Sequence, residues 1–330
     1  MNQREISPMY KLLQQGVSLV ELMVAMALSL VLLAGVVQIY VGSKQSFNVN
    51  DSLSRVQENA RVAMDFLARD IRMADFWGCV TGATNLNNDV NGGGSLDITL
   101  GGLSGSDNGG LNGSDSIRLQ GAYGSGIIIE APFMNTNAAA LHVSADNGLS
   151  QSDIVMVSDC SSADIFQISN ANPDTSGTVD HNTGNATSPG NATGDLSKVY
   201  AGDAELYKVR SVTYSIQAGP NGEPALFRND GTNNLELVNG VENMQVFYGE
   251  DTSNTQTADY YVPAGDVTDM ENVVSVKIVL LLRSHLDNVT TGGSQTYNYY
   301  TNNAASAISA NDNRLRQTYT STIAIRSRVP

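Results

Sequence analysis

The sequence contains few of the residues that build most catalytic and metal sites. Its 330 residues include two cysteines, three histidines and one tryptophan. The histidines, His142, His181 and His285, lie far apart, and neither an H-E-x-x-H nor a G-x-S-x-G pattern occurs. We therefore expect no enzyme, no bound metal and no cofactor.

Basic residues are also scarce. Lysine and arginine together number 18, against 33 aspartate and glutamate residues, which gives a formal net charge of -15. Most of the acidic excess follows Asp75. Because nucleic acids are bound through clustered positive charge, this balance argues against a nucleic-acid partner.

The two cysteines, Cys79 and Cys160, both follow the single long apolar segment, on the side that we expect to be exported. An even, minimal count in an exported region favours one disulfide over a metal site or a catalytic thiol, and two unpaired thiols are the alternative. In the chain-entropy model, a bridge closing a loop of roughly 80 residues stabilises the fold by about 4 kcal/mol.

Long hydrophobic runs are absent except for one near the N-terminus. Residues 1–16 are polar and weakly basic, and the run that follows, residues 17–41, is long enough to cross a bilayer as a helix. It is too long for the apolar part of a secretory signal, and no small-x-small cleavage site follows it. It contains one carboxylate, Glu21, whose burial in lipid costs several kcal/mol when it is unpaired.

After residue 41 the pattern becomes amphipathic without a helix breaker. Apolar residues recur at spacings of three and four, which is typical of a helix with one buried stripe. These are Val49, Leu53, Val56, Ala60, Met64, Leu67 and Ile71. The opposite face carries Arg55, Glu58, Arg61, Asp65, Arg69 and Arg72. We predict one helix from about Val17 to Met73, within a helical region over residues 17–76 whose part 42–76 is amphipathic.

From Trp77 the composition changes to Gly-, Asn- and Asp-rich loops separated by period-2 segments typical of strands. The clearest of these are Asp153–Cys160, Leu206–Ile216, Met244–Gly249, Val273–Leu282 and Thr318–Arg328. Asp230-Gly231 and Asn239-Gly240 are dipeptides suited to the tight turns of a meander. Residues 77–330 are thus predicted to form an antiparallel β-rich head with long loops, in an α+β fold.

The stretch "QQGVSLVE" is the most specific motif of the sequence, with Gly16 before the apolar run and Glu21 five residues later. It resembles the processing signal of the type IV pilin and pseudopilin superfamily. The resemblance implies that prepilin peptidase cuts after Gly16 and methylates the new N-terminal residue, Val17. The sequence departs from the family in having valine rather than phenylalanine there, and Gln38 where a helix proline is usual. Translation from Met9 would shorten the leader.

Further blocks narrow the resemblance to PilW-type minor pilins of type IV pilus assembly. They are "RVAMDFLARDIRMADFWGC", "SDC", "LVNGVENMQVFYGED", "VVSVKIVLLLRS" and "TSTIAIRSRVP". A minor pilin of this type would be a single-pass inner-membrane precursor with a periplasmic head, and then part of the pilus. The resemblance implies as partners other minor pilins, the major pilin and a large tip adhesin, with adhesion and twitching motility as the processes served.

Glu21 has a physical explanation within that resemblance. In a bundle of such helices its carboxylate can pair with the free ammonium group on Val17 of a neighbouring subunit, so that each charge offsets the other. The alternative is an acid that reaches the membrane interface by itself.

Weaker motifs remain. Asp107, Asn108 and Asp115 could bind calcium, but the EF-hand spacing is absent and solvated turn acids are the favoured interpretation. Three N-x-[ST] triplets, beginning at Asn185, Asn191 and Asn288, are interpreted as marking exposed loops.

Two other functional hypotheses fit the same pattern. One is a minor pseudopilin of a type II secretion system, which shares the processing signal and the long helix. The other is a surface-binding module displayed on a membrane stalk, with residues 92–115 and 170–203 as its binding loops.

Overall fold

The computed structural model describes residues 16–80, 85–92, 102–184, 188–287, 289–290, 295–301 and 304–329. The leader expected over residues 1–16 lies outside this set except for Gly16, and so do Met9, Asn185 and Asn288. The chain divides into a compact unit that ends at Asp51 and a second that begins at Ser52. The two units are described one at a time below.

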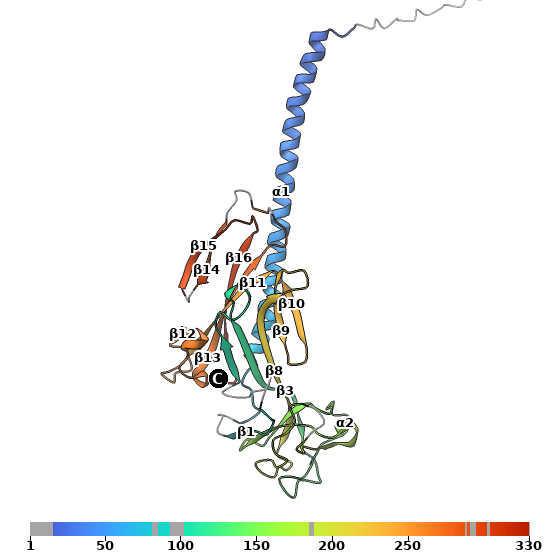
Figure 1. Ribbon diagram of the computed structural model, residues 1–330, viewed down its shortest axis with the longest axis vertical. Coiled ribbons are helices and arrows are strands. Elements are labelled where there is room, and N and C mark those ends of the chain that lie inside the picture. Colours follow the sequence, from blue (N-terminus) through green and yellow to red (C-terminus); the bar gives the residue numbers. More distant parts are fainter. Residues whose placement is uncertain are drawn as a thin grey trace, which may run out of the picture. The chain divides into compact units, whose positions relative to one another are not determined.

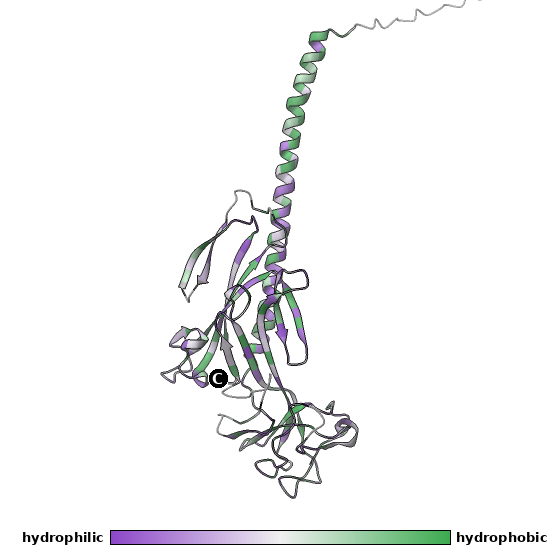
Figure 2. Cartoon of the chain, viewed as in Figure 1, coloured by the Kyte–Doolittle hydropathy of each residue, from purple (hydrophilic) through white to green (hydrophobic). Residues whose placement is uncertain are grey.

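A single helix, α1, covers Leu19–Arg72 and begins two residues later than predicted. Glu21 lies in its first turn, and Arg69 and Arg72 lie in its last, which is the charge arrangement that the helix dipole favours. The helix ends in a turn at residues 73–75, where Asp75 adopts a left-handed conformation. The first unit contains the N-terminal half of α1, whose apolar residues are drawn green in Figure 2.

In the second unit, the C-terminal half of α1 buries one stripe against two sheets, as the spacing predicts. Its buried apolar residues are Val56, Ala60, Ala63, Leu67 and Ile71. All six charged residues expected on the opposite face are exposed. Of the other expected stripe positions, Val49, Leu53 and Met64 are half-buried. The stripe belongs to one core with residues from both of the sheets described next.

The larger sheet has eight strands in the order β1-β6-β5-β8-β3-β2, with β9 paired to β8 and β10 to β9 (Figure 1). Its strands are β1 (Leu86–Asn88), β2 (Leu103–Ser106), β3 (Ser116–Ile128), β5 (Ile154–Ser158), β6 (Ala163–Gln167), β8 (Glu205–Ala218), β9 (Pro224–Asn229) and β10 (Asn234–Asn239). The pairs are antiparallel except β1 and β6, which are parallel.

The second sheet has four antiparallel strands in the order β12-β11-β13-β16. These are β11 (Val241–Glu250), β12 (Tyr260–Val262), β13 (Val273–Arg283) and β16 (Arg316–Ala324). Two smaller antiparallel pairs join β14 (Gln295–Thr301) to β15 (Ala304–Ala310), and β4 (Leu141–His142) to β7 (Thr178–Val179). Short helical turns are α2 (Pro173–Ser176), η2 (Leu111–Gly113), η3 (Ala264–Asp266) and η4 (Met270–Asn272).

The turn at Asn239-Gly240 corrects the predicted single meander. Asp230 and Gly231 do lie in the hairpin between β9 and β10, but Gly240 connects β10 to β11, which belong to different sheets. The Gly240 N–H donates to the carbonyl of Pro224 at 2.9 Å instead of closing a hairpin with β11. The head is therefore two sheets that enclose the α1 stripe, in the α+β fold class expected.

Residues 129–204 have a separate core of their own. It is built around Phe166 and Tyr200, which are fully buried, together with Leu141, Val179 and Leu196. Part of the segment expected to be loop, residues 170–203, thus supplies core side chains. Asn191 contradicts the expectation of an exposed N-x-[ST] site, because it is 2% exposed and its side chain exchanges two hydrogen bonds with the backbone of Gln167.

Candidate functional site

The N-terminal half of α1 presents an uninterrupted apolar surface. Every residue from Val17 to Val41 is exposed, and an 18-residue window of the helix reaches a mean hydropathy of 2.5 with none of it buried. By length and composition, the segment fits a single membrane span. The Ser29 hydroxyl donates a hydrogen bond to the carbonyl of Ala25 at 2.7 Å, so this polar group has a partner within the helix. A surface this apolar requires either lipid or other helices around it.

The predicted processing residues lie just ahead of the helix. Gly16, Val17 and Ser18 have no regular secondary structure, and the first helical bond found runs from Leu22 N–H to the carbonyl of Ser18 at 3.0 Å. Glu21 lies in the first turn of α1, four residues after Val17. It is exposed and has no ion-pair partner in the part of the chain that the structure describes. The arrangement leaves the Gly16–Val17 peptide bond and the Glu21 carboxylate free for outside partners.

A buried charge cluster fixes the other end of α1 to the larger sheet. Asp70, on the stripe, accepts hydrogen bonds from the hydroxyl of Tyr214 at 2.7 Å and from Arg210 and Arg228 at 2.9 and 3.2 Å. The sequence does contain a signal for this cluster, since Asp70 falls three residues after Leu67 on the apolar stripe, where an acid needs a partner. The spacing of apolar residues alone does not indicate which partners this acid has.

The C-terminal segment holds the end of the same helix. Arg326 N–H donates to the carbonyl of Arg72 at 3.1 Å, and the Ser327 hydroxyl donates to the carbonyl of Ala74 at 2.9 Å. Arg328 bonds to the Asp75 carboxylate at 2.6 Å. Burial raises the pKa of Asp75, although Arg328 acts in the opposite direction. The last residues of the chain thus cap α1.

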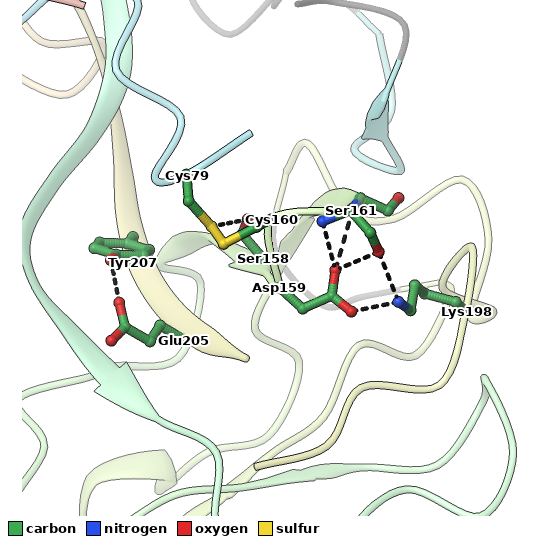
Figure 3. The surroundings of a disulfide bond; sticks show 9 residues. Cys79, Ser158, Asp159, Cys160, Ser161, Lys198, Glu205 and Tyr207 are labelled. Carbon is green, nitrogen blue, oxygen red and sulfur yellow. Dashed lines mark hydrogen bonds and ion pairs between the residues drawn. A yellow bond between two sulfur atoms is a disulfide. The ribbon is translucent and has the colours of Figure 1, made fainter. Parts of the chain in front are cut away.

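The disulfide joins the segment after α1 to the turn between β5 and β6. Cys79 and Cys160 are linked by an S–S bond of 2.06 Å (Figure 3). Beside it, Asp159 accepts hydrogen bonds from Lys198 and Ser161 and from the backbone of Ser162. Burial alone would raise the pKa of Asp159, but these donors lower it to about 2. The bridge therefore ends on a turn that is itself held by a charged network.

Two family models match the chain. The model of the prokaryotic N-terminal methylation motif matches residues 11–37, and the model described as Type IV Pilus-assembly protein W matches residues 213–327. These matches show a type IV pilin-like protein, close to PilW. The first match contains Gly16, Val17 and Glu21. The second contains the C-terminal part of β8, the strands that follow it, and Arg326 and Ser327, which contact the end of α1.

Comparison with known structures finds a type IV-like pilin from Thermus thermophilus. The two chains are 13% identical, the match covers 84% of this pilin and 98% of the other chain, and the TM-score is 0.35. No curated protein matches the sequence.

Asp107 and Asp115, two of the residues considered as calcium ligands, accept hydrogen bonds from backbone N–H groups. Both carboxylate oxygens of Asp115 accept backbone N–H groups, from Asn108 and Val246, at 2.8 Å. Asp107 accepts N–H groups from Ala264 and Gly265 at 2.9 and 2.7 Å. Among the residues that the structure describes, no group of three or more His, Cys, Asp or Glu side chains could hold a metal ion. The Asp107 and Asp115 carboxylates therefore hold a loop against η3 and β11. They are not the solvated acids of a turn that the sequence favoured.

The pilin head also has a cavity of 380 Å³ that sequence reasoning did not find. It lies beside the β14–β15 hairpin and is lined by three tyrosines of β14 together with amide side chains of β11 and of the 108–113 turn. The tyrosine-rich stretch "TYNYYT" was the available signal. By itself this stretch does not indicate a cavity, because alternating tyrosines also fit an ordinary strand.

Proposed function

We propose that this pilin is a minor pilin of a type IV pilus, a non-catalytic component that helps to initiate or cap filament assembly. One observation carries the proposal. Among the residues that the structure describes, none covers the apolar surface of residues 17–41, and most of this surface lies in the match to the methylation motif of a chain that also matches a pilus-assembly family. Such a surface is suited to burial among the helices of other pilins.

The proposal assigns three parts to the chain. Residues 1–16 are a leader that prepilin peptidase removes by cutting after Gly16, with methylation of Val17. Residues 17–76 form the assembly helix, of which residues 17–41 are the membrane span and later the filament core. Residues 77–330 form the head. The absence of regular structure at Gly16 and Val17 supports this assignment, because a peptidase needs an extended substrate.

Glu21 would select and position the neighbouring subunit. Its carboxylate would pair with the new ammonium group of Val17 on an adjacent helix, after transfer from lipid into the filament. The lack of any partner for Glu21 in the described chain supports this role. Two charges that are costly to bury alone become tolerable together.

The precursor would sit in the inner membrane with its head in the periplasm before it enters the pilus. Its proposed partners are prepilin peptidase, the other minor pilins, the major pilin and a large tip adhesin. The disulfide fits an exported head, because structural disulfides persist in oxidising compartments.

Deletion of the gene, with complementation, tests the proposal. We expect loss of surface pili with normal amounts of secreted enzymes. Normal pili together with a loss of secreted enzymes would instead show a minor pseudopilin of type II secretion. A membrane-displayed module would need no processing, so a Gly16→Ala substitution that leaves surface display unchanged would favour that reading over the pilin.

A further inference from the structure

The cavity at the β14–β15 hairpin has an aromatic wall. Tyr297, Tyr299 and Tyr300, all on β14, line it together with Leu281 of β13. Tyr299 is 3% exposed and fixed, because its hydroxyl donates to the Asn243 side-chain oxygen at 2.9 Å. Tyr297 is half-buried, with Arg316 5.8 Å from its ring centroid. Tyr297 is thus more accessible than Tyr299, and it is not held by Lys277 as the half-buried Tyr300 is, so we choose Tyr297 as the ring to test.

The lining also includes amide side chains that are held by the backbone. Asn243 donates to the carbonyl of Asn112 at 2.8 Å, Asn112 donates to the carbonyl of Glu242 at 3.0 Å, and Gln245 donates to that of Gly113 at 3.1 Å. These bonds use the amide nitrogens. The side-chain oxygens of Asn112 and Gln245 have no hydrogen-bond partner among the residues that the structure describes. They are fixed acceptors at the wall of the cavity.

The charges at the cavity cancel. Glu242, the only carboxylate in its lining, is bound through both oxygens by Arg316, at 2.6 and 3.0 Å. A ligand therefore meets neither a free acid nor a free base here. Hydrolysis of a glycosidic bond needs two available carboxyl groups, so this lining does not have the chemistry of a glycosidase.

We propose that this cavity binds a neutral saccharide. An aromatic ring covers the C–H face of a sugar, and fixed amide oxygens accept hydrogen bonds from its hydroxyl groups. The volume is at the lower end of that of small-molecule sites, which suits one or two sugar rings. The site lies on β11, β14 and the 108–113 turn, outside the assembly helix, so the proposal does not depend on the proposed function.

Saturation-transfer NMR on the full-length protein tests the proposal. The protein is kept in a zwitterionic detergent without a sugar headgroup, and the probes are glucose, galactose, mannose, N-acetylglucosamine, lactose and cellobiose. We expect transfer to the ring C–H protons of at least one probe. Binding of none of them would overturn the proposal. So would binding of only sialic acid or only a proline-rich peptide, included as a charged sugar and as an alternative aromatic-site ligand.

Paired variants locate the binding. Tyr297→Leu should weaken it about tenfold, because the ring is lost, whereas Tyr297→Phe should stay within about twofold of the wild type. Tyr260→Leu is the matched control, since Tyr260 is an exposed tyrosine of β12 outside the cavity. Urea unfolding curves show whether each variant is folded. Equal binding by the Tyr297→Leu and Tyr260→Leu proteins would overturn the assignment to this cavity.

Discussion

The carboxylate of Asp70 on α1 accepts a 2.7 Å hydrogen bond from the buried hydroxyl of Tyr214 on β8. Arg210 and Arg228 complete the cluster at the same carboxylate. The amphipathic half of the helix is therefore joined to the larger sheet by a charged network as well as by its apolar stripe. The helix and the larger sheet thus have two kinds of contact at this junction, one apolar and one charged.

Replacing the central acid of that cluster should be costly. Asp70→Asn leaves two guanidinium groups without their shared counter-charge, and we expect the free energy of unfolding to fall by about 3 kcal/mol in urea denaturation. Asp65→Asn, on the exposed face of the same helix, should change it by less than about 0.5 kcal/mol. Equal effects of the two substitutions would contradict a structural role for the cluster.

The disulfide should contribute strongly to stability. Its cysteines are 81 residues apart in sequence, and replacing both with serine should lower the free energy of unfolding by about 4 kcal/mol in the chain-entropy model. Adding a reductant to the wild-type protein should shift its urea midpoint toward that of the double variant. The double variant itself should not respond to the reductant. An unchanged wild-type midpoint after complete reduction would show that the bridge does not stabilise the head.

Asp89 should make stability depend on pH. Burial, with a smaller contribution from the nearby Asp164, raises the pKa of Asp89 to about 6, and its Oδ2 is buried without a partner. Asp164 is itself fully buried and accepts a hydrogen bond from the Tyr200 hydroxyl at 2.5 Å. The unfolded chain loses the Asp89 proton near pH 4 and the folded chain near pH 6, so stability falls as the pH rises between these values.

Asp89→Asn removes this titration. Its amide cannot ionise, so we expect it to stabilise the protein by about 1–2 kcal/mol at about pH 7 and to change little at about pH 4. Urea unfolding at the two pH values measures the difference. An equal effect of the substitution at both would contradict the raised pKa.

Glu21 should matter for assembly and not for the amount of precursor. Because Glu21→Ala leaves the Val17 ammonium of a neighbour unpaired in the filament, we expect at least about tenfold less protein in sheared pili with normal amounts in the membrane. Quantitative immunoblots of both fractions provide the measurement. Gln38→Ala, at another polar position of the apolar segment, is the control and should assemble normally. Normal assembly of the Glu21→Ala protein would refute the ion pair.

Local patterns predicted the elements of this fold well. The spacing of three and four fixed the buried stripe of α1, and period-2 alternation located β5, β8, β11, β13 and β16. The pairing of the strands was harder to predict from local patterns. The division into two sheets at Gly240 and the parallel pair of β1 and β6 depend on contacts between distant segments, which no short window of sequence contains.

The sequence could indicate a site only where the residues form a local motif. Gly16, Val17 and Glu21 form such a motif, and their roles in processing and assembly stay predictions. The Asp70 cluster unites residues more than 130 positions apart. The tyrosine and amide residues of the cavity also come from separate segments, since Tyr299 is 56 positions from Asn243 and Asn243 is 131 positions from Asn112. The prediction for Asn191 was wrong. Its N-x-[ST] triplet is typical of exposed loops, but its side-chain amide is buried and forms hydrogen bonds with the backbone of Gln167.

The most direct test of the account is the N-terminal residue of this protein in sheared pili, determined by mass spectrometry of its first peptide. We predict a peptide that begins with N-methylated Val17, recovered from the pilus fraction. Detection of the protein only in membranes, with residues before Val17 still attached, would contradict both processing after Gly16 and a place in the filament.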